Sequence, residues 1–150
     1  MCILLEEPAW KLYLTELCKV DSLHMSTATR AETHLSAKGK KGQAGAVKMD
    51  ELIEFLNIRM IDFGSQDIAA FQDASDRYHA TARPSGPLNM GDIFAYVLAT
   101  QLDMPLFFQG MDFLQTPVKN AMHILGYQMT IESLGMPCVV GQSGQDIDPA

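Results

Sequence analysis

The sequence predicts an α/β fold in which helices cover both faces of a central parallel sheet. Segments with apolar residues at helical spacing alternate with short segments rich in β-branched and aromatic residues. Hairpin turn signals are absent between these segments, so successive strands are expected to be joined by helical crossovers and to run parallel. The 150 residues, 47% of them hydrophobic, are enough to bury one core. We therefore expect a three-layer α/β/α sandwich.

The first half of the chain predicts three helices and a strand. Apolar spacing predicts one helix over residues 4–20, and a short extended segment should follow at residues 23–26. Ser26 or Thr27 is a suitable N-cap for a second helix over residues 27–38. The Lys-Gly run at residues 38–42 is expected to end that helix. A third helix is predicted over residues 47–57, before a strand at residues 58–63.

The second half continues the alternation up to about residue 118. Ser65 should cap a helix over residues 66–79 whose inward positions include Ile68, Ala69, Phe71, Ala74 and Tyr78. Prolines and a glycine make residues 82–87 a loop. Asn89 should cap a strongly apolar helix over residues 91–102, and residues 105–108 read as a short buried strand.

The remaining residues follow a weaker pattern. We place one domain at residues 1–118 and a C-terminal extension at residues 119–150. Within the extension, residues 119–126 are expected to be helical and residues 127–131 extended. The Gly, Ser, Gln and Asp content of residues 141–150 predicts disorder.

Composition limits the class of protein. The net charge of −7 argues against a protein that coats nucleic acid nonspecifically, because such binding needs many Lys and Arg contacts to phosphate. It leaves a metal-dependent nuclease open, since a bound ion supplies the positive charge that faces phosphate. No apolar run approaches the roughly 20 residues that cross a bilayer. Three cysteines without metal-type spacing indicate reduced thiols, and a cytoplasmic location is expected.

Four passages resemble the PIN domains, and within them the VapC toxins of bacterial toxin–antitoxin pairs. They follow one another in the order and spacing that the family uses, over roughly residues 3–118. The passage from Asn89 to Ala99 is the most specific of the four. The passages are residues 3–8 (ILLEEP), 26–32 (STATRAE), 89–99 (NMGDIFAYVLA) and 107–113 (FFQGMDF).

The resemblance implies a PIN-like fold and a metal-dependent endoribonuclease that cleaves RNA. It places Glu32, Asp92 and Asp112 in the metal site, as the family's second, third and fourth acids, with Mg²⁺ or Mn²⁺ as the ion. The family's first acid lies in a strand just before the first helix, and that strand is expected to be largely missing here. Two further departures are Gln109, where the family often has Lys, and Pro117, where an acid is frequent.

The chemistry of these residue types agrees with that assignment. Mg²⁺ and Mn²⁺ prefer oxygen ligands, usually a few carboxylates with the remaining positions left to water and phosphate. Crowding three carboxylates should also raise their pKa values. Each residue has a simpler reading: Asp92 as a charge at a helix start, Glu32 as a solvated helical residue, and Asp112 as a turn residue.

Two functions from different classes remain open at this point. The first is a toxin ribonuclease with RNA as substrate, a VapB-type antitoxin as partner, and a homodimeric assembly, all implied by the resemblance. The second is a catalytically impaired PIN fold that acts as an antitoxin-binding module, because the first acid is absent. A start site upstream of Met1 would explain the missing strand as well.

Overall fold

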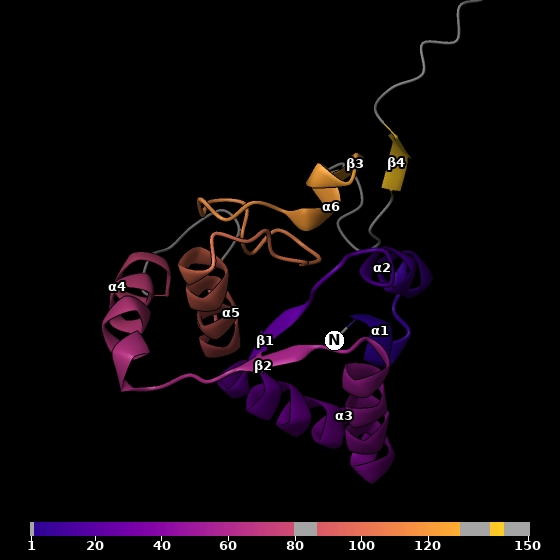
Figure 1. Cartoon of the computed structure of the whole chain (residues 1–150), viewed down its shortest axis with the longest axis horizontal. Coiled ribbons are helices and arrows are strands. Elements are labelled where there is room, and N and C mark those ends of the chain that lie inside the picture. The colour runs from indigo at the N-terminus through magenta and orange to yellow at the C-terminus, as the bar shows by residue number, and fades with distance from the viewer. Residues whose placement is uncertain (1, 80–86, 130–138, 143–150) are drawn as a thin grey trace, which may run out of the picture.

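A parallel two-stranded sheet lies at the centre of the computed structural model, which describes residues 2–79, 87–129 and 139–142 (Figure 1). The strands are β1 (His24–Ser26) and β2 (Arg59–Ile61). A helical segment connects them, as a parallel pair requires. The predicted α/β class and the parallel pairing are confirmed, although this sheet has two strands among the described residues and is narrower than expected.

The predicted single helix over residues 4–20 is wrong, because the chain breaks after its first turn. The structure has α1 (Cys2–Leu5) and α2 (Trp10–Leu17). Between them Glu6 and Ala9 adopt left-handed backbone angles, with φ of 54° and 72°. Pro8 lacks a backbone N–H and disfavours helical geometry in the residue before it, so the helix cannot run through this point.

Helix α3 (Thr27–Phe55) is much longer than the helix predicted over residues 27–38. Ser26 caps it, accepting a hydrogen bond from the Ala28 backbone N–H at 3.2 Å. The Lys-Gly run does not end it, because lysine is a good helix former. Only Gly42 leaves helical geometry, at φ 65° and ψ −158°, and there the helix kinks. The helix predicted over residues 47–57 is the second part of α3.

The two parts of α3 are held together across the kink. The Arg30 guanidinium donates to Asp50 Oδ1 at 2.6 Å, joining residues twenty positions apart. A Cβ at buried Gly45 would lie 2.5 Å from the Ala37 backbone oxygen. The chain therefore needs a residue without a side chain where these segments meet.

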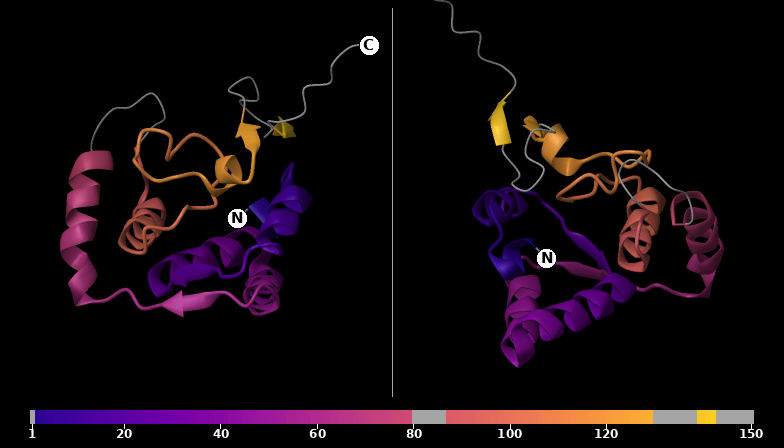
Figure 2. Two further views of the ribbon diagram at one scale, coloured as in Figure 1. Left: turned by 45° about the horizontal axis from the view of Figure 1, so that its top comes forward. Right: turned by 180° about the vertical axis from the view of Figure 1, so that it is seen from behind.

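Two further helices form the other side of the molecule. A 3₁₀ turn, η1 (Ser65–Asp67), leads into α4 (Ile68–Tyr78), and α5 (Met90–Gln101) follows. Helix α4 packs along α5, which also packs against β1 and α3 (Figure 2). The core between them contains Ala74, Tyr78, Leu88, Ile93, Val97, Phe108 and Phe113.

The expectation that Ile68 and Ala69 face inward is wrong, since both are exposed. The buried stripe of Phe71, Ala74 and Tyr78 instead reaches back to Asp67. Asp67 Oδ2 accepts from the Gly64 backbone N–H at 2.7 Å, and Oδ1 accepts from Gln101 at 2.8 Å. These hydrogen bonds, the first named being the larger, hold the pKa of Asp67 below its usual value. A buried polar residue thus takes the position that the pattern assigned to an apolar one.

The predicted strand at residues 105–108 is reduced to a single parallel bridge between Leu106 and Asn120. The Leu106 N–H donates to the Lys119 carbonyl at 2.9 Å, and the Ala121 N–H donates to the Leu106 carbonyl at 3.0 Å. The predicted strand is short, and Gly110, at φ 92°, turns the chain soon after it. No longer ladder forms there.

The C-terminal extension carries α6 (Ala121–Ile124) and β3 (Tyr127–Met129), near the expected helical and extended segments. Strand β3 pairs antiparallel with β4 (Val139–Gln142), so residues 141 and 142 are ordered, contrary to the predicted disorder. Residues 143–150 and most of the predicted loop at 82–87 lie outside the described residues. No helix in the described part of the chain is long and apolar enough to cross a membrane.

Candidate active site

Asp92 sits in the first turn of α5 and is locked there by a capping box. The Asn89 side-chain Oδ1 accepts from the Asp92 backbone N–H, and Asp92 Oδ2 accepts from the Asn89 backbone N–H, both at 3.0 Å. The predicted cap at Asn89 is confirmed. The N-terminal end of a helix carries partial positive charge, which favours an anion at this position. The carboxylate of Asp92 is thus held in a single orientation at the start of α5.

Glu32 approaches the same helix end from α3. Its carboxylate lies against the backbone of Gly91, so that a Cβ added at Gly91 would be 2.9 Å from both Glu32 Cδ and Oε2. Ser36, one turn further along α3, donates its hydroxyl to Glu32 Oε1 at 2.9 Å. Glu32 is half-buried, so it is not a freely solvated helical residue.

Asp112 arrives from the third direction, on the turn that follows residues 105–108. Gly110 adopts φ 92° there, a conformation that glycine accepts without strain. Asp112 Oδ2 lies 3.8 Å from the position that a Gly110 Cβ would occupy. The side chain is exposed, as expected for a residue that faces solvent or a ligand.

The three carboxylates share one electrostatic environment. Partial burial is the main cause that raises the pKa of Asp92 above its ordinary value, and the charges of Asp112 and Glu32 raise it further. The hydrogen bond from the Asn89 backbone opposes these effects. Three acids separated by up to 80 residues in the sequence therefore meet at the start of α5. Within the described ranges, no three His, Cys, Asp or Glu side chains are placed closely enough to hold one metal ion.

Comparison with known proteins places the chain in a family. It is similar to Ribonuclease VapC of Mycolicibacterium smegmatis, with 29% identity over 118 residues, covering 79% of this chain and 91% of that protein. It is 31% identical to Ribonuclease VapC30 of Mycobacterium tuberculosis over 94 residues, covering 63% of this chain and 71% of that protein. The chain belongs to the VapC ribonuclease family. A VapC ribonuclease of Rhizobium meliloti is 28% identical over 111 residues, covering 71% and 76% of the two chains. No family model matches the chain.

Two residues of this VapC chain that contact Glu32 were missed from the sequence. Ser36 lies four positions after Glu32, a spacing that puts both on one face of a helix. Gly91 directly precedes Asp92, and a glycine inside the first turn of a helix is unfavourable unless something needs the space. Both signals were present in the sequence, but Gly91 gains its meaning only from the approach of Glu32.

Gln109 is a further residue of interest in the VapC chain, where the resemblance notes a frequent lysine. Its side-chain Oε1 is buried and has no hydrogen-bond partner within the described structure. An unpaired buried acceptor costs free energy, so this side chain is poorly accommodated where it stands.

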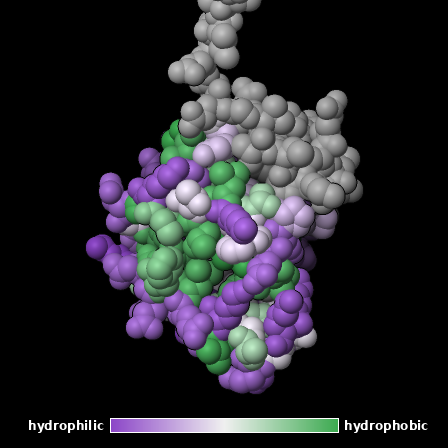
Figure 3. All heavy atoms as spheres, turned by 90° about the vertical axis from the view of Figure 1, so that its right-hand side faces the viewer, coloured by the Kyte–Doolittle hydropathy of each residue, from purple (hydrophilic) through white to green (hydrophobic). Residues whose placement is uncertain are grey.

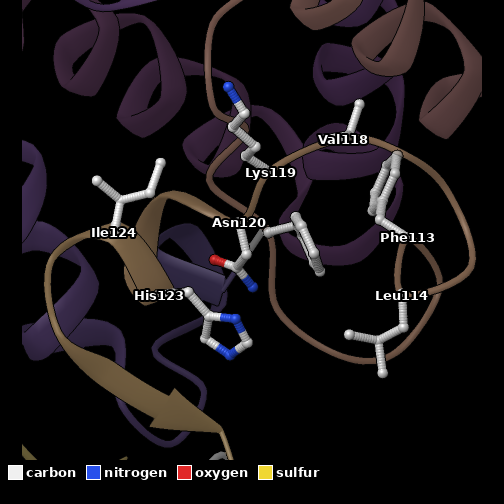
Figure 4. Close-up of a pocket in the computed structure, with 8 residues that line it drawn as sticks. Phe113, Leu114, Val118, Lys119, Asn120, His123 and Ile124 are labelled. Carbon is white, nitrogen blue, oxygen red and sulfur yellow. The ribbon is translucent and has the colours of Figure 1, made fainter. Parts of the chain in front are cut away.

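An apolar hollow of about 470 Å³ opens beyond Asp112 (Figure 4). Phe113 and Leu114 lie on one side of it, and His123 and Ile124 lie on the other. Leu114 and Ile124 are exposed large hydrophobic residues. The full lining is Phe108, Phe113, Leu114, Val118, Lys119, Asn120, His123 and Ile124.

Proposed function

We propose that this VapC-family chain is a metal-dependent endoribonuclease, the toxin of a type II toxin–antitoxin pair, and that Glu32, Asp92 and Asp112 hold its metal ion. The observation that carries the proposal is the meeting of these three carboxylates at the N-terminal end of α5. Helix α3, helix α5 and the turn after residues 105–108 each contribute one carboxylate. No single local structure explains why the three charges lie together, since their mutual repulsion opposes folding.

The donor set suits Mg²⁺ or Mn²⁺. All three side chains offer hard oxygen ligands, which such ions prefer over nitrogen and sulfur. The absence of a side chain at Gly91 leaves room for the Glu32 carboxylate beside Asp92. Rotation of Glu32 and exposed Asp112 toward Asp92 would bring the three oxygens onto one ion. When bound, the ion supplies the Lewis acidity that lowers the pKa of a water and neutralises charge on the phosphate.

The chain's own residues provide the positioning for this chemistry. The capping box uses Asp92 Oδ2 and leaves Oδ1 as the oxygen available to a ligand. Ser36 engages Glu32 Oε1, so Oε2 is the oxygen that lies toward Gly91 and Asp92. Fixed donors need little reorganisation during the reaction, and this contributes to catalysis.

Metal removal tests the proposed function. Cleavage of a mixed RNA pool by the purified chain should be lost after EDTA treatment and return on titration with Mn²⁺ or Mg²⁺. The Asp92→Asn variant, purified in parallel, controls for contaminating ribonucleases and should show no metal-dependent cleavage. Cleavage that survives EDTA would refute the metal-dependent mechanism. A chain that binds its antitoxin but never cleaves RNA would instead be the impaired binding module.

A protein partner is the second part of the proposal, with a VapB-type antitoxin and a homodimer as the expected assemblies. Hydrophobic side chains gather within hydrophilic surroundings on the side of the molecule that includes the second part of α3 (Figure 3). In that part of α3, Phe55 and Val47 are 70% and 47% exposed. Exposed apolar side chains of this size support a role in protein contact.

We expect Phe55→Asp to weaken assembly, measured as the mass of the protein in solution with and without its antitoxin. Placing a charge in an apolar contact leaves that charge desolvated and unpaired, which is unfavourable. The control is Gln72→Asp, an equally exposed position on α4, which should leave the mass unchanged. Identical assemblies for wild type and Phe55→Asp would remove this face from the interface.

A further inference from the structure

The Glu32 carboxylate is held on two sides by residues that are not themselves acids. Ser36 donates its hydroxyl to Oε1 at 2.9 Å. On the other side, Oε2 and Cδ lie 2.9 Å from the position of a Cβ at Gly91, closer than real Cβ contacts allow. Only glycine at position 91 lets the carboxylate rest in this place without a shift.

We infer that Ser36 and Gly91 are positioning residues that clamp the Glu32 carboxylate toward Asp92. The inference rests on the proposed function, because it assigns a purpose to the orientation of Glu32. Without Ser36, the long Glu32 side chain can rotate about its χ angles into solvent, since only the hydroxyl ties down Oε1. With alanine at position 91, the new methyl group occupies the space of Oε2 and turns the carboxylate away from Asp92.

Alternative reasons for the two residues are weaker. A glycine at the second position of α5 is unfavourable for helix formation compared with alanine, so helix stability does not explain it. Gly91 has no positive φ, and its backbone conformation is open to any residue. The approach of Glu32, together with Asn89 Oδ1 at 3.2 Å, is what fills the space around it.

The first test measures binding of Mn²⁺ alone by calorimetry. Removing a group that supports a metal ligand typically weakens metal affinity by about 10- to 100-fold, and we expect a loss of that size for Ser36→Ala and for Gly91→Ala. Ser36→Thr keeps the hydroxyl and should restore affinity to within a few-fold of wild type. The matched control is Gly39→Ala on α3, where no atom lies within 4 Å of the new methyl group and affinity should not change.

The second test needs no metal and keeps the inference separable from the proposed function. Gly91→Ala is introduced into wild type and into Glu32→Ala, and the midpoint of chemical unfolding is measured for all four proteins. In the Glu32→Ala background, Gly91→Ala should stabilise, because helix propensity improves and the carboxylate is gone. In wild type the gain should be smaller or reversed. Equal effects in both backgrounds would refute the clamp.

The combined outcomes distinguish the two claims. A wild-type chain that binds no Mn²⁺ but shows coupling between positions 32 and 91 would overturn the metal site and retain the contact. A chain that binds Mn²⁺ equally well in wild type, Ser36→Ala and Gly91→Ala would retain the metal site and overturn the clamp.

Discussion

Replacing Asp92 with asparagine is expected to abolish RNA cleavage while making the metal-free protein more stable. Asparagine has nearly the same shape, and its Oδ1 can still accept the Asn89 backbone N–H that holds the capping box. It lacks the negative charge that a divalent cation needs. We expect cleavage to fall by more than about 100-fold, which exceeds the usual loss for residues that only support a ligand.

The gain in stability follows from the raised pKa of Asp92. Partial burial and the charges of Asp112 and Glu32 penalise its ionised form in the folded protein. The folded-state pKa therefore lies above the unfolded one, so the charged group costs stability at neutral pH and this cost disappears as pH falls through the folded-state pKa. Asp92→Asn should melt at a higher temperature than wild type at pH 7, and the difference should shrink at lower pH.

Asp76→Asn on the exposed surface of α4 is the control for Asp92→Asn, and neither its melting temperature nor its cleavage should change. An Asp92→Asn protein that melts below wild type at pH 7 would show that the carboxylate contributes more through its cap than it costs through repulsion. Retained cleavage would remove Asp92 from the site.

The second large effect is expected at Ile93, the neighbour of Asp92 that points into the core. Ile93 is 1% exposed and belongs to the cluster that contains Phe108 and Phe113. Truncation of a fully buried isoleucine to alanine typically costs about 2–5 kcal/mol, because the cavity it leaves is only partly refilled. We expect Ile93→Ala to lower the free energy of unfolding by that amount in denaturant titration.

The position of Ile93 also couples the core to the site. The segment with Phe108 and Phe113 carries Asp112 between them, so loosening the packing of α5 on this segment should displace Asp112 relative to Asp92. Met90→Ala, at a 58% exposed position on the same helix, should change the free energy of unfolding by no more than roughly 0.5 kcal/mol. A loss below about 1 kcal/mol for Ile93→Ala would mean that this cluster does not hold α5 in place.

The family relationship and the α/β class were predictable from the sequence, together with the elements that local contacts specify. Helix α5 is the clearest case, because Asn89 and Asp92 form a cap within four residues and an apolar stripe follows directly. Strand β1 and the cap of α3 at Ser26 were also predicted from neighbouring residues. Errors occurred where the chain passed a weak local signal, as in the Lys-Gly run that α3 continues through.

The acids themselves could be picked out from the sequence, but their placement could not be derived from local pattern. Glu32 and Asp92 are 60 residues apart, and no rule of helix or strand periodicity relates their side chains. Their proximity arises from the packing of α3 against α5, which also gives Ser36 and Gly91 their contacts with Glu32. Hydrogen bonds over three or four residues determine a cap or a helix from sequence alone. Contacts between distant segments depend on how the core packs, and only the tertiary structure decides them.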